Sequence, residues 1–209
     1  MKRLALLVGA LLAAVVLAAC GNDSGSTGTS ASTNTATATS ATGSDDHNSA
    51  DVAFTQSMIM HHGQAVEMAD LAPTRASSAE VKTLARQIRD AQAPEITMMT
   101  GWLTAWGQPT ISSGSGMDMG AGHDMTVMPS HSMAGMMSEQ DMSKLRAASG
   151  RDFDRMFLTM MIEHHRGAIE MATTEQRDGF YGPAKELAGS IVTSQTAEIT
   201  TMEKLLENI

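Results

Sequence analysis

The sequence has little of what usually fills or crosslinks a protein core. One cysteine is present among 209 residues, so the chain can form no internal disulfide. Aromatic residues make up 3%, whereas methionine occurs 19 times. Lys and Arg number 14 against 23 Asp and Glu, a formal charge of -9. This balance excludes a nucleic-acid surface, because phosphate binding needs concentrated cations. The abundance of methionine therefore needs its own explanation.

Residues 1–20 have the pattern of a secretion signal. Lys2 and Arg3 precede an apolar run that is too short to span a bilayer. The run ends in Leu-Ala-Ala-Cys20-Gly, which resembles the lipobox of bacterial lipoproteins. The resemblance implies that Cys20 is lipidated and anchors the mature protein to the cell membrane on its extracytoplasmic face. The alternative is an ordinary signal that happens to end in cysteine.

The composition divides the rest of the chain into segments. Residues 21–48 are mainly Ser, Thr, Ala, Gly and Asn, and we expect a disordered tether because they have almost no apolar bulk. Residues 49–209 are expected to form one helical domain. A Met/His-rich linker at 108–138 separates two blocks of similar length, 51–106 and 154–208.

The two blocks are copies of each other. Residues 51–103 align with residues 154–206 without a gap, and about 20 of the 53 positions are identical. In each copy the apolar residues recur with helical period on one face of two successive segments. Two helical hairpins would bury these faces against each other. The sequence therefore predicts an all-α, ferritin-like four-helix bundle without a sheet.

A histidine pair lies on the apolar face of the first helix in each copy, and a glutamine and a glutamate lie on that of the second. Burying such groups is costly unless they pair with each other or bind a ligand. Because both copies carry them, we predict a metal site. The candidate ligands are Met58, His61, His62, Met68, Met161, His164, His165 and Met171, and residues that could orient them or bind directly are Gln92, Glu95, Gln195 and Glu198. The alternative is that Glu95 and Glu198 satisfy the histidines within the core while methionine fills gaps.

The linker is a second candidate metal site. It has Met residues and histidines in a Gly/Ser-rich setting, where thioethers gain nothing unless they bind an ion or a partner. These residues are Met117, Met119, His123, Met125, Met128, His131, Met133, Met136 and Met137. Thioether and imidazole together favour Cu(I), and imidazole also suits Cu(II). A lipid-facing or interface loop is the alternative.

One motif occurs twice in the chain. It is Phe-x3-Met-x2-His-His-x2-Ala-x2-Met-Ala, followed by Gln-x2-Glu-Ile, and it resembles the family called domain of unknown function 305. The resemblance covers nearly all of residues 49–208. It implies a ferritin-like four-helix bundle that binds copper outside the cytoplasm through the eight Met and His positions. The copies differ at Gly63-Gln64, where the second has Arg166-Gly167, and at Pro94.

The leading hypothesis is a membrane-anchored lipoprotein that buffers copper or passes it to a copper-accepting protein, with no catalysis of its own. Two alternatives remain open. One is a ferritin-like metal-dependent oxidoreductase, which is disfavoured because di-iron bundles use Glu-x-x-His on two helices and neither copy supplies that histidine. The other is a structural lipoprotein that binds no metal.

Overall fold

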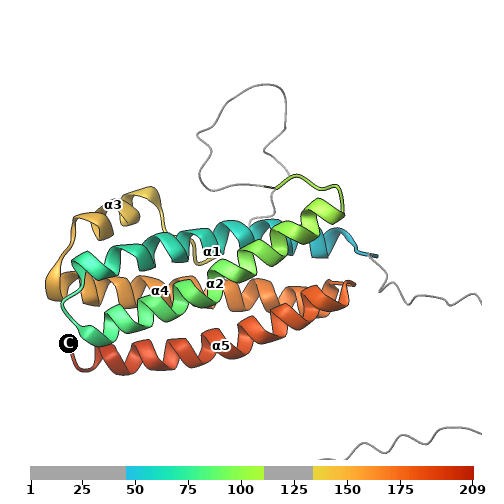
Figure 1. The fold of residues 1–209 in the computed structure, drawn as a ribbon. Coiled ribbons are helices and arrows are strands. Elements are labelled where there is room, and N and C mark those ends of the chain that lie inside the picture. The colour runs from blue at the N-terminus through green and yellow to red at the C-terminus, as the bar shows by residue number, and fades with distance from the viewer. Residues whose placement is uncertain (1–45, 111–133) are drawn as a thin grey trace, which may run out of the picture. The chain divides into compact units, whose positions relative to one another are not determined.

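The computed structural model describes residues 46–110 and 134–209, and in this part of the chain the regular secondary structure is helical. The helices are α1 (Ser49–Arg75), α2 (Ala79–Ala105), α3 (Glu139–Ala147), α4 (Gly150–Asp178) and α5 (Gly182–Leu206). The four long helices run side by side (Figure 1). The prediction of an all-α bundle is confirmed. The short α3 is an addition to the four expected helices, and Ser138 caps its start.

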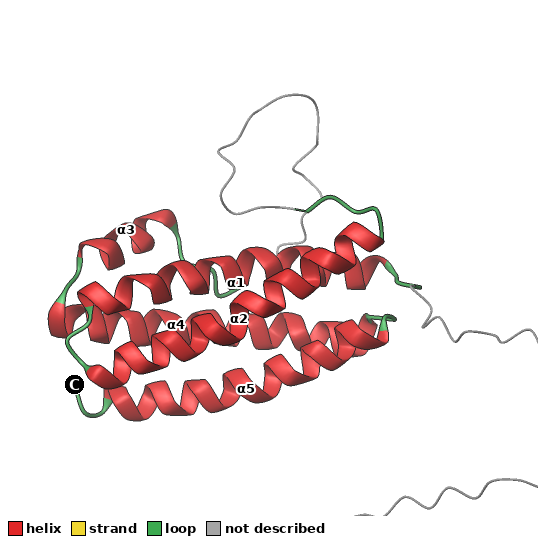
Figure 2. Ribbon diagram, viewed as in Figure 1, coloured by secondary structure: helices red, strands yellow, loops and turns green. Residues whose placement is uncertain are grey.

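The bundle consists of two antiparallel hairpins, one from each copy of the repeat (Figure 2). Helix α1 packs against α2 and α4 packs against α5, while the contact between α1 and α4 joins the hairpins. Asn48 begins α1 as a capping box, in which its side chain accepts from Asp51 N at 3.1 Å and Asp51 accepts from Asn48 N at 2.6 Å. Among the described helices, none is long and apolar enough to cross a membrane.

The apolar core is divided into two clusters of buried residues. One contains Met68, Phe153 and Met161, and the other contains Met58 and Met171 with further residues of all four long helices. In the sequences of α1 and α4, the histidine pairs lie between the segments that contribute to the two clusters. The histidine pairs therefore lie in the middle of the bundle and not at one of its ends.

Two buried aspartates connect each copy of the repeat to the other. Asp51 accepts hydrogen bonds from the backbone N–H groups of Phe180 and Tyr181, at 3.0 and 2.9 Å, where α5 begins. Asp154, at the equivalent position of the second copy, accepts from the N–H of Ser78 at 2.9 Å, where α2 begins. A carboxylate is favoured at a helix N-terminus, because unpaired N–H groups are concentrated there. These bonds align the hairpins.

The two ends of the bundle differ beside these aspartates. The Ser77 hydroxyl donates to Asp154. Asp51 is next to Glu175, which is 1% exposed, and burial together with the neighbouring Asp51 raises the pKa of Glu175 to about 8. The charges that also act on Glu175 are those of Lys185 on α5 and Asp178 on α4. With its pKa raised to about 8, the Glu175 carboxyl group is mainly protonated at neutral pH.

We expect Glu175→Gln to make the stability of the fold less dependent on pH. In the wild type, Glu175 ionises near pH 4.5 when unfolded and near pH 8 when folded, so the unfolded state binds fewer protons between these values. The free energy of unfolding should therefore fall as pH rises from 4.5 to 8 and level off above. The variant lacks this loss, and its Tm should exceed that of the wild type by a few degrees at pH 8 but not at pH 4.5.

Thermal unfolding followed by circular dichroism across this range checks the expectation. Glu170→Gln, on the exposed side of the same helix, is the control. Equal changes in Tm at both pH values would contradict a raised pKa at Glu175.

Candidate metal centre

Four histidines lie together at the middle of α1 and α4. The side chains of His61, His62, His164 and His165 are all fully buried, with 0% exposure. The ring centroids of His61 and His164 are 3.7 Å apart with planes inclined at 39°, and those of His164 and His165 are 6.4 Å apart. The sequence positions explain this arrangement, because residues 61 and 164 are equivalent in the repeat and face each other where the helices pack.

A glutamate from the second helix of each copy contacts the outer histidine of that copy. His62 Nε2 lies 2.6 Å from Glu95 Oε2, and His165 Nε2 lies 2.7 Å from Glu198 Oε2. The carboxylates are 22% and 21% exposed, so they retain contact with water while the imidazoles do not. A ring nitrogen that bonds a carboxylate carries a proton, so Nε2–H donates in both pairs, and in the neutral form of the ring the lone pair is on Nδ1.

Many of the buried polar atoms in this region have no hydrogen-bond partner in the part of the chain that the structure describes. They include Nδ1 of all four histidines and Nε2 of His164, and also both amide atoms of Gln92 and Oε1 of Gln195. Leaving a buried polar atom unpaired costs about 1–3 kcal/mol. The unpaired atoms at the middle of the bundle therefore lower the stability of the fold. The lone pairs of the imidazole nitrogens are suited to bind a ligand.

The inner imidazoles are neutral under ordinary conditions. Burial, followed by the nearby His62, lowers the pKa of His61 to about 3. Burial and the nearby His61 lower the pKa of His164 well below its usual range. A metal competes with protons for the imidazole lone pair, so a neutral ring is available to bind it.

The four predicted methionine ligands are buried in the two core clusters. Met58, Met68 and Met161 are 0% exposed, and Met171 is 8% exposed. Each cluster contains one of these methionines from α1 and one from α4. In residues 46–110 and 134–209, no three His, Cys, Asp or Glu side chains gather as metal ligands.

The structure places only the end of the predicted linker site. Met136 and Met137 are half-buried, and Met137 packs against the core cluster that contains Phe153. The remaining candidates, and the lipidation site, lie outside the described residues: Cys20, Met117, Met119, His123, Met125, Met128, His131 and Met133.

The sequence analysis missed the contacts that hold this end of the linker. The Gln64 side chain donates to Met137 O at 2.9 Å and accepts from Met137 N at 2.7 Å. The Ala134 carbonyl accepts from His61 Nε2 at 3.2 Å. A signal was present, because Gln64 and Gly167 are one of the pairs at which the copies differ next to the histidine motif, but a single sequence does not say what such a difference accommodates.

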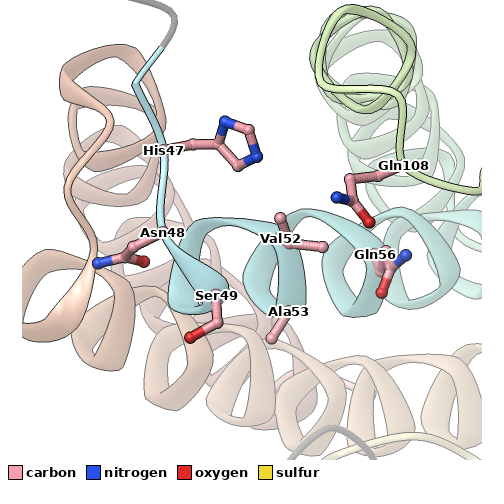
Figure 3. Close-up of a pocket in the computed structure, with 7 residues that line it drawn as sticks. All are labelled: His47, Asn48, Ser49, Val52, Ala53, Gln56 and Gln108. Atoms are coloured by element: carbon pink, nitrogen blue, oxygen red, sulfur yellow. The ribbon is translucent and has the colours of Figure 1, made fainter.

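A cleft at the start of α1 is a weaker candidate site. His47, Asn48, Gln56 and Gln108 line it together with small side chains of α1 (Figure 3). The His47 ring stacks on Trp106 with a centroid distance of 4.4 Å. The lining supplies one imidazole and neither a carboxylate nor a thioether, so it offers less to a metal than the middle of the bundle does.

Comparison with known proteins identifies similar sequences and structures. The family model of the domain of unknown function DUF305 matches residues 51–206. A DUF305 protein from Streptomyces coelicolor, described as a candidate secreted protein, is 37% identical over 76% of this chain and 93% of its own, with a TM-score of 0.66. A DUF305 fragment from Deinococcus radiodurans is 31% identical over 78% and 98%, with a TM-score of 0.65.

CopM is also similar and has been solved with copper. Its Cu(I)-bound form is 30% identical over 76% of this chain and 96% of that chain, with a TM-score of 0.58. Its Cu(II)-bound form is 32% identical over the same shares, with a TM-score of 0.60. These similar structures are thus of DUF305 proteins and a copper-bound protein, and none of them is named as an enzyme. No curated protein sequence matches the chain.

We expect His164→Leu to stabilise the metal-free protein. Leucine has a similar size, and it removes two buried nitrogens that have no partner among the described residues. The free energy of unfolding should rise by about 1–2 kcal/mol. His165→Leu is the matched control, and it should lower the free energy of unfolding because Glu198 loses its partner. Denaturant unfolding in the presence of a chelator measures both, and a destabilised His164→Leu would contradict the cost assigned to these nitrogens.

Proposed function

The chain belongs to the DUF305 family, and from that premise we propose that it binds copper outside the cytoplasm, as a buffer or as a donor to a copper-accepting protein. The proposed ligands within the bundle are the four buried histidines together with Met58, Met68, Met161 and Met171. The residues proposed to orient these ligands are Gln92, Glu95, Gln195 and Glu198. Cu(I) is favoured and Cu(II) is compatible with the imidazoles.

The observation that carries the proposal is the set of four fully buried imidazoles at the middle of the bundle, whose Nδ1 atoms have no hydrogen-bond partner among the described residues. Glu95 and Glu198 bond the Nε2 side of two of these rings. A metal-bound histidine usually donates its other nitrogen to a carboxylate or carbonyl in this way.

The donor chemistry favours copper over harder ions. Mg²⁺ and Ca²⁺ require carboxylate, carbonyl and water ligands, whereas the buried groups here are imidazoles with thioethers in the adjoining core clusters. CopM has been solved in a Cu(I)-bound form, at 30% identity, and in a Cu(II)-bound form, at 32% identity. This similarity supports copper as the metal bound here. A thioether also resists the oxidation that would inactivate a thiolate outside the cytoplasm.

The arrangement supports binding and not turnover. In ferritin-like di-iron enzymes, glutamates project inward as ligands from several helices. Here Glu95 and Glu198 are each engaged by a histidine of the same hairpin and remain partly in contact with water. We therefore propose that the protein is not an enzyme, and oxygen consumption on addition of Cu(I) or Fe(II) would contradict this.

The proposed location is the extracytoplasmic face of the cell membrane, with the lipid on Cys20. In this arrangement the signal segment before Cys20 is removed and Cys20 becomes the first residue of the mature protein. Residues 21–48 tether the bundle, and residues 49–209 form the domain that binds metal, with repeats 51–106 and 154–208. Its support is the lipobox-like sequence around Cys20 and the similarity to a candidate secreted protein.

We expect His61→Ala combined with His164→Ala to abolish tight copper binding by the bundle. The double variant removes both inner imidazoles, and the affinity for Cu(I) should fall at least 100-fold, since each lost ligand or supporting contact commonly costs about 10-fold or more. Competition with a chromophoric Cu(I) chelator measures it. His47→Ala, in the cleft at the start of α1, is the control and should keep the wild-type affinity. Wild-type affinity in the double variant would contradict the proposed site.

We expect the linker to bind copper separately from the bundle. Replacing residues 114–132 by a Gly/Ser sequence of the same length should lower the number of Cu(I) ions bound, while the helical content stays the same because the described helices lie outside this segment. Elemental analysis of protein saturated with Cu(I) measures the first and circular dichroism the second. An unchanged copper content would contradict the linker site.

A further inference from the structure

The segment Ala134–Met137, here called the clamp, lies on the bundle beside the inner histidines. It is the last described part of the Met/His-rich linker and precedes α3. Its first residue, Ala134, accepts a hydrogen bond from His61 Nε2 at 3.2 Å, and its last, Met137, makes both of its backbone hydrogen bonds with the Gln64 side chain. The clamp is thus fixed at both ends, and one end is fixed to a proposed ligand.

Two glycines allow the clamp to come this close. A Cβ atom on Gly167 would lie 2.1 Å from the Ala134 carbonyl oxygen, and a Cβ atom on Gly135 would lie 2.6 Å from the Glu163 carbonyl oxygen. Gly135 also has a φ of +75°, which side chains other than glycine rarely adopt. Any larger side chain at position 167 would displace the clamp from α4.

The clamp docks where the repeat is broken. Gln64 and Gly167 occupy equivalent positions in the two copies, yet one provides hydrogen bonds and the other provides space. The clamp contacts α1 through the hydrogen bonds of Gln64 and contacts α4 at Gly167, where only a glycine leaves room. The two positions therefore have different requirements, and the copies differ there. The asymmetry extends to the inner histidines, since His61 has the Ala134 carbonyl as a partner while both nitrogens of His164 have none among the described residues.

We propose that the clamp fixes the tautomer of His61 and thereby selects Nδ1 as its metal-binding atom, with Gln64 and Gly167 as the positioning residues. A carbonyl can only accept, so His61 must carry its proton on Nε2 and keep the lone pair on Nδ1. Glu95 and Glu198 impose the same choice on the two outer histidines. The clamp is thus the counterpart, for an inner histidine, of the carboxylates that orient the outer ones. The inference rests on the proposed copper site.

The test begins with the metal-free protein, where it does not depend on copper. Nitrogen NMR of ¹⁵N-histidine-labelled protein distinguishes the protonated from the unprotonated ring nitrogen, and wild-type His61 should be protonated on Nε2. Gln64→Ala removes both bonds to Met137, and Gly167→Ala displaces the clamp through its Cβ. Each variant should reduce the population of the Nε2–H form of His61 and leave His62 and His165 unchanged. Gly101→Ala is the matched control, because a Cβ at this helical glycine meets nothing within 4 Å.

The second measurement is the affinity for Cu(I) of the same proteins. Gln64→Ala and Gly167→Ala should weaken it about 10-fold, as loss of a group that orients a metal-binding histidine does, and Gly101→Ala should not change it. Protonation of wild-type His61 on Nδ1, or an unaltered His61 spectrum in both folded variants, would overturn the inference. A third outcome is that the variants alter the His61 signals while the wild-type protein binds no copper. This outcome would overturn the proposed function but would leave the effect of the clamp on the tautomer in place.

Discussion

The burial of four imidazoles at the point where α1 and α4 pack is the constraint that the rest of the bundle must accommodate. Polar side chains in this position oppose folding unless they have hydrogen-bond partners. Among the described residues, only some of the imidazole nitrogens have one. The surrounding helices compensate with two apolar clusters and with aspartates that connect the copies at both ends. The stability of the bundle therefore comes from its two halves, which leaves the middle available for chemistry that does not favour folding.

Duplication explains how such an arrangement is built from few parts. Each copy contributes an inner histidine, an outer histidine and a glutamate that reaches the outer ring. Antiparallel packing of the copies then brings the inner rings within 3.7 Å of each other. A single hairpin would expose these groups to water, where they would be ordinary histidines, so the properties of the site arise from the association of two copies.

The departures from the repeat are as informative as the repeat. The raised pKa of Glu175 makes one end of the bundle sensitive to pH. Gln64 and Gly167 accommodate the clamp. As a result one inner histidine has a partner. A site that begins as two equivalent halves thus acquires two distinguishable histidines.

The sequence by itself determined the helical class, the two hairpins and the burial of the histidines, because periodicity and internal repetition are properties of the chain that do not depend on its folding. It also identified Glu95 and Glu198 as groups on the buried face. Only the tertiary structure decided that Asp51 and Asp154 bond the start of the opposite copy's second helix, that the pKa of Glu175 is raised, and that the end of the linker contacts His61. The aspartate bonds and the Ala134 contact join residues about 70 to 130 positions apart through backbone groups, whose partners depend on folding and carry no side-chain signature in the sequence. The pKa of Glu175 depends on burial and on Asp51, which are likewise set by folding.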